Sequence, residues 1–372
     1  MTKTIVQEKN AVTNKEINRK ENKLIYLEIM RIVACFFVLF NHTGTWGHTL
    51  FQTSEINSLE YWIYLFISIF CKFSVPLFLM ISGALLLPKE KESLREVWKK
   101  RIFKILLILV IWSFLYYLYE VFLGNERFNL LTFFSKLYYD YWNFSYWYIY
   151  CYIGFLICIP FLRVLVNNLE NKYFYYMYGI AIVTLSIIPT LQYILVNDKY
   201  AINWALNMGW LTTNFVLFPC IGYFLEYRVQ INKKLVIGAL IINLITLIIS
   251  CQLSYLKTIR DCYNGGEYFH QTFVLINSST IYITIKYIFT KLNLSEKTNK
   301  IIISIGSCTL GIYLMHIFFM RKFNFFVKIF ATLGNIIREK MLTAFAFCIF
   351  VMGICYIITL LLKKIPFIKK IV

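Results

Sequence analysis

The chain has 372 residues, of which 59% are hydrophobic and only 15% are charged. A soluble globular domain usually carries about 25% charged residues, so this composition excludes an ordinary soluble protein and indicates a membrane protein. A formal net charge of +19 would also suit a nucleic-acid binder. The basic residues, however, stand in short clusters between apolar stretches and form no nucleic-acid motif, so we expect no nucleic-acid partner.

The N-terminal region differs from the rest of the chain. Its first 23 residues are polar, carry six Lys and Arg, and contain no apolar run before a small-residue cleavage site. This pattern predicts a cytoplasmic tail over residues 1–23 rather than a signal peptide. We expect a membrane domain over residues 24–362 and a cytoplasmic C-terminal tail over residues 363–372.

Ten apolar segments follow the tail. A helix that crosses the ~30 Å hydrocarbon core needs about 20 residues, because its backbone polar groups must be satisfied internally. The segments are 24–42, 61–87, 102–123, 146–162, 173–196, 210–227, 235–255, 269–289, 301–320 and 342–362. We therefore predict an all-α fold, a polytopic membrane helix bundle of about ten transmembrane helices.

Lys and Arg accumulate in the N-terminal tail, in the loops after the even-numbered segments and in the C-terminal tail. The positive-inside rule then places both termini in the cytoplasm. The exception is the basic loop at 321–341, which stands on the predicted outer side. The loop at 124–145 has room for at most a short interfacial helix. The abundance of Lys, Ile, Asn, Tyr and Phe suggests an AT-rich bacterial genome and hence a bacterial plasma membrane.

The first segment, LIYLEIMRIVACFFVLFNHTG, contains three ionisable residues, Glu28, Arg31 and His42. Such residues are costly in a bilayer and are functional candidates by default. Arg31 and His42 are 11 residues apart, a step that rotates a helix by about 20° and rises about 16 Å, so both lie on one face. Glu28, one turn before Arg31, can pair with it. Alternatively, Glu28 and Arg31 are an interfacial ion pair and His42 only caps the helix.

An Arg and a His separated by ten residues in the first span resemble the signature of the acyltransferase 3 family of integral membrane acyltransferases. Four further stretches resemble later helices of that family in order, namely CKFSVPLFLMISGALLLPK, KKRIFKILLILVIWS, SYWYIYCYIGFLICIPFLR and IGSCTLGIYLMHIFF. The sequence departs from the family at Glu28, where Asp is usual, and at Ile32, where Gly commonly follows the Arg.

The resemblance implies O-acyl transfer from a cytoplasmic acyl-CoA to a hydroxyl of a cell-envelope polysaccharide or glycolipid. It carries over to Arg31 and His42 as catalytic residues, with Glu28 beside them. A histidine can take the proton of an attacking hydroxyl, and an arginine can hold a phosphate or pantetheine carbonyl or stabilise an oxyanion. Acyl-CoA, most simply acetyl-CoA, would be a co-substrate; no permanently bound cofactor and no metal site is expected.

Basic residues of the second and third segments are candidates for holding the donor. Arg101 and Lys104 open the third segment on the cytoplasmic side and could bind the phosphates of coenzyme A, although positive-inside charge also explains them. Lys72 lies midway along the second segment, where it must face a cavity or pair with an acid. We group all three as candidate cofactor-binding residues. Ser82 and Gly83 are expected to serve helix packing.

Aromatic residues and a second histidine are candidates for the acceptor site. Trp147 and Tyr148 begin the fourth segment and could stack on a sugar, or anchor the helix at the interface. Tyr313 and His316 share a face of the ninth segment and could form a second polar wall, or simply pack. The bilayer and a carbohydrate acceptor are the expected partners, and the oligomeric state is left open.

Two other classes of protein fit part of the pattern. A transporter or exporter of a polysaccharide or lipid-linked sugar would also need many helices and buried charges, but it predicts related halves that the sequence does not display. A membrane module that serves a soluble catalytic partner is the third possibility.

Overall fold

The computed structural model describes residues 25–89, 92–196, 213–337, 339–366 and 368–372, which form helices and turns without a strand in these ranges. The predicted all-α class is therefore confirmed, whereas the predicted tail at 1–23 lies outside the described residues. The first helix occupies residues 25–41. The later helices are α2 (Leu59–Phe70), α3 (Ser74–Leu86), α4 (Leu94–Glu96), α5 (Phe103–Phe122), α6 (Leu130–Tyr139), α7 (Trp147–Asn168), α8 (Asn171–Ile182), α9 (Ile188–Val196), α11 (Asn214–Tyr227), α12 (Lys233–Arg260), α13 (Val274–Phe289), α14 (Glu296–Ser307), α15 (Thr309–Ile317), α16 (Asn324–Ile337) and α17 (Lys340–Leu362).

Where they are described, all ten predicted segments are helical for most of their length. Six helices in the described part are long and apolar enough to cross a membrane, and the pair α14–α15, bent by 47°, would make a seventh. The first helix, α11 and α13 are shorter, so the count of ten spans and the cytoplasmic position of both termini remain predictions. Below, "inner" and "outer" denote the Glu28 end and the His42 end of the first helix.

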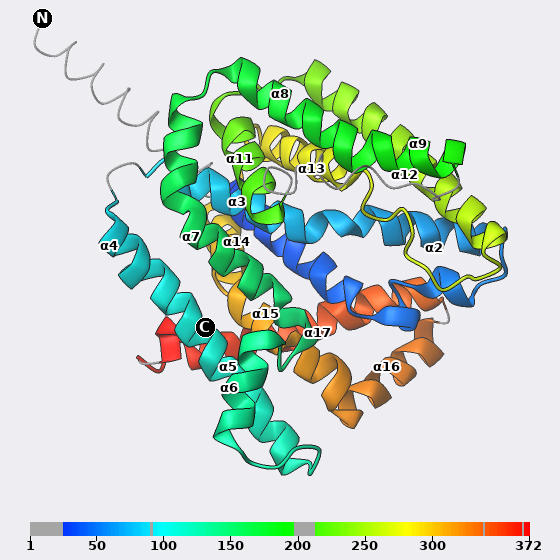
Figure 1. Ribbon diagram of the computed structural model, residues 1–372. Coiled ribbons are helices and arrows are strands. Elements are labelled where there is room, and N and C mark those ends of the chain that lie inside the picture. The colour runs from blue at the N-terminus through cyan, green and yellow to red at the C-terminus, as the bar shows by residue number, and fades with distance from the viewer. Residues whose placement is uncertain (1–24, 90–91, 197–212, 338, 367) are drawn as a thin grey trace, which may run out of the picture.

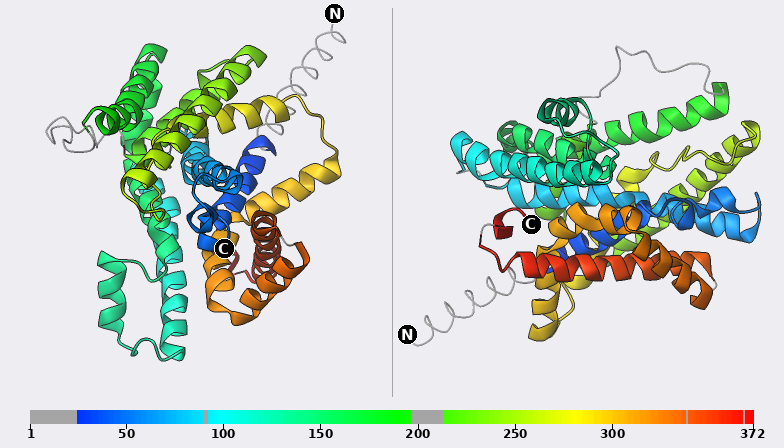
Figure 2. Two further views of the ribbon diagram at one scale, coloured as in Figure 1. Left: turned by 90° about the vertical axis from the view of Figure 1, so that its right-hand side faces the viewer. Right: turned by 90° about the horizontal axis from the view of Figure 1, so that it is seen from below.

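The first helix runs through the middle of the bundle (Figures 1 and 2). Its residues Met30, Ala34 and Leu39 are fully buried, and the helix contributes to three of the apolar clusters that form the core. Because these positions are spread around the helix and have no exposed surface, other helices enclose it on most sides. Polar side chains on this helix therefore face protein rather than lipid.

Helices α3 and α11 approach each other backbone to backbone. A Cβ atom added at Gly83 would lie 2.0 Å from the carbonyl oxygen of Pro219, and one added at Gly222 would lie 2.0 Å from that of Met80. Small residues allow such close packing, which is a main source of helix association in membranes. The packing role expected for Gly83 is thus confirmed.

The second predicted segment is one helical span, Leu59–Leu86, in which a short 3₁₀ stretch at Cys71–Phe73 interrupts the α-helical pattern between α2 and α3. Pro76, in the first turn of α3, has no N–H to donate and is tolerated there. The amide of Asn41, from the first helix, donates to the carbonyl oxygen of Cys71 at 3.3 Å. Neighbouring side chains commonly satisfy the backbone groups that such a break frees. The break places Lys72 at the wall of a cavity.

The loop at 124–145 contains the short helix α6, as the sequence analysis allowed. It projects with the end of α5 away from the rest of the bundle (Figures 1 and 2). Asn129 caps α6 by accepting hydrogen bonds from the backbone of Leu131 and Thr132. Trp142 packs behind it and donates to the carbonyl of Phe133 at 3.2 Å. These contacts hold the hairpin in one conformation.

Candidate functional site

Two cavities adjoin the first helix. The inner one, about 280 Å³, is lined by Arg31 and is called the Arg31 cavity. The outer one, about 200 Å³, is lined by His42 and is called the His42 cavity. The polar face predicted from the 11-residue spacing of Arg31 and His42 therefore faces a cavity at both of its ends.

The two cavities share four lining residues. Val38 of the first helix, Val75 of α3, Tyr148 of α7 and Tyr313 of α15 belong to both walls. The rings of Tyr148 and Tyr313 meet edge to face, with their centroids 5.8 Å apart. These four side chains form the boundary between the cavities, which we call the junction.

Arg31 and Glu28 form the ion pair predicted from their spacing. Arg31 Nη1 lies 2.5 Å from Glu28 Oε1. Glu28 is buried, and its other oxygen, Oε2, has no hydrogen-bond partner among the described residues. A Cβ atom added at Gly306 would lie 2.1 Å from that oxygen, so α14 closes over the pair. Arg31 is 29% exposed at its side chain, and it also lines the cavity.

His42 stands at the outer end of the first helix with its ring free of hydrogen bonds to the described residues. Its ring centroid lies 5.1 Å from that of His316 and 5.1 Å from that of Phe144. Arg321 Nη2 donates to the backbone carbonyl of His42 at 2.9 Å and its guanidinium lies over Phe144. The backbone at His42 is thus fixed while the imidazole remains available to a substrate.

His316 has a defined tautomer in this arrangement. Its Nδ1 lies 2.5 Å from the carbonyl oxygen of Tyr313, and since a carbonyl only accepts, Nδ1 carries the proton. Nε2 is then the basic nitrogen, and it is buried without a hydrogen-bond partner among the described residues. Two histidines, His42 and His316, therefore stand side by side at the outer end of the bundle.

Tyr313 and the start of α7 complete the wall of the His42 cavity. Tyr313 donates a hydrogen bond to the carbonyl oxygen of Ser145. Trp147 and Tyr148 line this cavity as well, and Tyr148 lines both. The structure thus brings the aromatic candidates of the sequence analysis to the same cavity as His42. Their predicted role in binding the acceptor stays a prediction.

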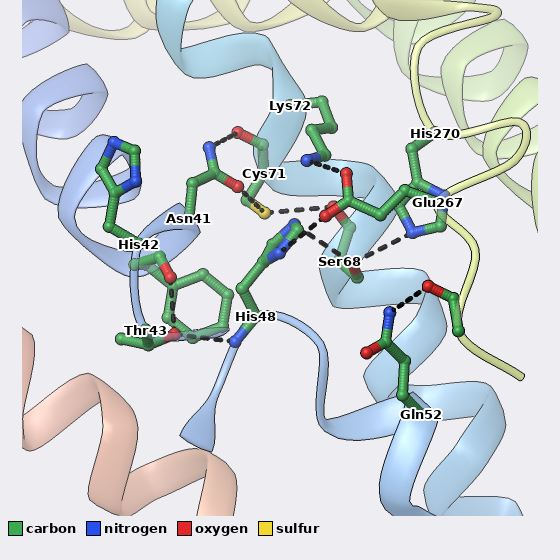
Figure 3. A network of polar contacts seen from close by, with 12 residues as sticks. Asn41, His42, Thr43, His48, Gln52, Ser68, Cys71, Lys72, Glu267 and His270 are labelled. Carbon is green, nitrogen blue, oxygen red and sulfur yellow. Dashed lines mark hydrogen bonds and ion pairs between the residues drawn. The ribbon is translucent and has the colours of Figure 1, made fainter. Parts of the chain in front are cut away.

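Lys72 lies at the outer end, together with residues that the sequence analysis did not single out. Its Nζ lies 2.5 Å from Glu267 Oε2, and Glu267 Oε1 lies 3.5 Å from His48 Nδ1 (Figure 3). The hydroxyl of Ser68 lies 3.1 Å from Nε2 of His48 and 3.1 Å from Nε2 of His270. Ser68 and both of these histidines are buried and line neither cavity, so this chain of contacts ties three segments together behind Lys72.

The other two basic candidates lie at the inner end of the molecule. Arg101 Nη2 lies 2.8 Å from Glu92 Oε1, and Arg163 Nη2 lies 2.6 Å from Glu92 Oε2. Burial alone would raise the pKa of Glu92, but hydrogen bonds from Arg101 and Arg163 hold it below its ordinary value. Lys104 is exposed. The structure therefore does not bring Arg101 and Lys104 together with Lys72, and a donor-binding role for any of them stays a prediction.

Several residues of the site left only weak signals in the sequence. His48 follows His42 by six residues in a polar stretch, and its proximity to His270 depends on contacts between distant loops. Asn41, Ser145 and Gln271 line the His42 cavity and are ordinary loop or helix-end residues by composition. Arg163 could have been noticed as a basic residue at the end of an apolar segment. All four histidines of the chain lie around the outer end, which no periodicity reveals.

These features define a class of protein: a multi-pass helical membrane protein whose central helix presents an arginine and a histidine to two adjoining internal cavities. The chain matches the acyltransferase 3 family, described as an acyltransferase domain, over residues 24–360. It belongs to this family, and the resemblance recognised from its motifs is confirmed. The chain matches no curated protein and no solved structure.

Proposed function

We propose that this membrane acyltransferase moves an acyl group, most simply acetyl, from acyl-CoA to a hydroxyl of a cell-envelope polysaccharide or glycolipid at a bacterial plasma membrane. The observation that carries the proposal is the junction, at which the Arg31 cavity and the His42 cavity share their walls. Donor and acceptor would enter from opposite ends of the bundle and react where the cavities meet.

The separation of Arg31 and His42 assigns them different tasks. Their Cα atoms are about 16 Å apart along the helix axis, so the two side chains cannot act on the same carbonyl group. His42 is proposed as the base that activates the acceptor. Arg31 is proposed to hold the donor away from the reacting carbonyl, through a phosphate or pantetheine oxygen, rather than to stabilise the oxyanion. Glu28 would fix the orientation of Arg31.

The reaction converts the thioester of the donor into an oxygen ester on the sugar. As the sugar oxygen attacks the thioester carbonyl, His42 takes the hydroxyl proton, a contribution of about 10² to 10⁴ in rate. When the tetrahedral adduct collapses, the carbon–sulfur bond breaks and the protonated His42 returns the proton to the thiolate. The products are the acylated sugar and free coenzyme A, and the enzyme is regenerated without an oxidant or a permanently bound cofactor.

The lining of the His42 cavity supports a hydroxylated acceptor. Asn41, Ser74, Asn214 and Gln271 supply hydrogen-bonding groups, and Trp147 supplies an apolar face. Ligand sites typically combine apolar walls with a few such polar groups that fix orientation. A sugar ring, with hydroxyls at its edge and C–H groups on its faces, is complementary to this lining.

The test uses purified protein, labelled acetyl-CoA and de-O-acylated envelope polysaccharide from the cells that carry the gene. We expect His42→Gln to lower kcat by about 10² to 10⁴ while acetyl-CoA still binds. The matched control is His270→Gln, which changes a buried histidine at the same end of the bundle that lines neither cavity. It should keep kcat within about threefold.

Full transfer by a well-folded His42→Gln protein would overturn the mechanism. If the parent protein transfers no label but exchanges the polysaccharide precursor across liposomes without any acyl donor, the chain is a transporter and the proposed function is wrong.

A further inference from the structure

A third cavity, of about 530 Å³, lies between the outer end of α5, the α6 hairpin and the π-helical stretch Phe318–Lys322 that continues α15. We call it the α6 pocket. Neither the donor nor the reacting hydroxyl of the proposed reaction needs it. Nine of its ten lining residues are aromatic or charged.

The groups that line the inner part of the α6 pocket are held by contacts with the rest of the protein. The rings of Tyr116 and Trp142 line it and both are buried. Lys136 Nζ lies 4.3 Å from the centre of the Trp142 ring, and the Trp142 indole is fixed by its hydrogen bond to α6. Glu120 Oε1 and Lys322 Nζ are 2.5 Å apart at the wall. Preorganised groups of this kind reduce the ordering that a ligand must impose.

The rim offers two exposed aromatic faces. Tyr141 is 40% exposed and Phe144 is 42% exposed, and both line the pocket. Amphipathic rings in a cleft with charged neighbours suit a ligand that has apolar faces and many hydroxyl groups. Charges of both signs line the pocket, Glu120 and Glu126 against Lys136, Arg321 and Lys322, so it is not built for an anion alone.

The α6 pocket is connected to the reaction centre through two residues. Phe144 contacts the His42 ring on one side and the Arg321 guanidinium on the other, the latter at 4.7 Å from the ring centre. Arg321 itself lines the pocket and holds the His42 carbonyl. A ligand seated here lies one side chain away from the proposed base.

We infer that the α6 pocket binds the sugar units of the acceptor chain that neighbour the unit being acylated. The inference rests on the proposed function and deepens it, because it makes the acceptor an extended glycan rather than a single sugar. Tyr141 is the stacking platform, and the charged groups of the wall hydrogen-bond the hydroxyls of the chain. Phe144 and Arg321 fix the position of the bound glycan relative to His42.

The experiment compares a long and a short acceptor. The long one is the de-O-acylated envelope polysaccharide, and the short one is its acid hydrolysate to single sugars. We expect Tyr141→Ala to lower kcat/KM by about tenfold with the polysaccharide, as loss of an interfacial tyrosine commonly does, and to leave the hydrolysate reaction and the KM for acetyl-CoA unchanged. Glu126→Gln should also lower kcat/KM with the polysaccharide, but by a smaller factor.

The matched control is Tyr138→Ala. Tyr138 lies on α6, is 92% exposed and does not line the pocket, so both reactions should keep the parent rates. Equal loss with both acceptors, no loss with either, or the same loss in Tyr138→Ala would overturn the inference. Failure of the parent protein to transfer label to either acceptor would instead overturn the proposed function, and the inference with it.

Discussion

The Arg31 cavity and the His42 cavity lie along the same helix and share a wall, yet their linings differ. The inner one is lined mainly by aliphatic and aromatic side chains, and its charged group, Arg31, is already paired with Glu28. The outer one has Asn, Gln, Ser and Lys side chains around an imidazole that makes no hydrogen bond to the described residues. The difference suggests that the inner cavity accepts an apolar acyl and pantetheine arm, and the outer one a hydroxylated molecule.

Apart from the loss of His42 itself, removal of the paired charge in the inner cavity should have the largest effect. Arg31→Ala leaves the buried Glu28 carboxylate without its partner, which costs about 1–3 kcal/mol of stability. We expect a lower thermal midpoint and a KM for acetyl-CoA raised at least tenfold. In the double variant Glu28→Gln with Arg31→Ala, the thermal midpoint should return toward that of the parent protein, while the KM for acetyl-CoA stays high. Recovery of both would mean that Arg31 only neutralises Glu28.

A larger side chain at the junction should separate the two cavities. Val75→Phe places a ring in the wall that they share, so both substrates should still bind while kcat falls by about tenfold or more, since small errors of placement are costly in transfer reactions. Val75→Ala is the control and should keep most of kcat. A kcat for Val75→Phe equal to that of the parent, measured at saturating substrates, would show that the acyl group does not cross the junction.

Of these three changes, the loss of Lys72 from the outer cavity should have the smallest effect. Lys72→Met removes the charge that faces the His42 cavity and leaves Glu267 beside His48. We expect the KM for the polysaccharide to rise about threefold to tenfold, on the scale of one lost hydrogen bond, whereas the donor-binding role predicted from the sequence would raise the KM for acetyl-CoA instead. A rise confined to acetyl-CoA would place Lys72 on the donor side, contrary to this comparison.

The sequence predicted the helices and the first-helix site well, for a physical reason. Apolar length is a local property, and a helix of fixed pitch converts the spacing of Glu28, Arg31 and His42 directly into geometry. Hence the pairing of Glu28 with Arg31, and the shared face of Arg31 and His42, could be foreseen. The motifs that resemble the acyltransferase 3 family also predicted the order of the later helices.

Contacts between distant segments could not be foreseen in the same way. The chain of contacts from Lys72 through Glu267 to His48 depends on how two loops fold against the 3₁₀ stretch at Cys71–Phe73, which the sequence does not encode as a period. The break at Cys71–Phe73 was visible only as Pro76 in an apolar run. Membrane crossing by the shorter helices and the side on which each terminus lies depend on the bilayer, so they remain predictions.

The reciprocal glycine contact between α3 and α11 bears on how the enzyme moves. Any side chain beyond hydrogen at Gly83 or Gly222 would collide with backbone atoms of the facing helix, so we expect these two closely packed helices to keep their spacing. This pair carries Val75 and Phe218 of the cavity walls and acts as a fixed frame. If the passage widens during turnover, we expect the movement in α7 and α15, which carry the Tyr148 and Tyr313 rings at the junction. A cross-link between α3 and α11 should then leave catalysis intact, whereas one between α7 and α15 should stop it.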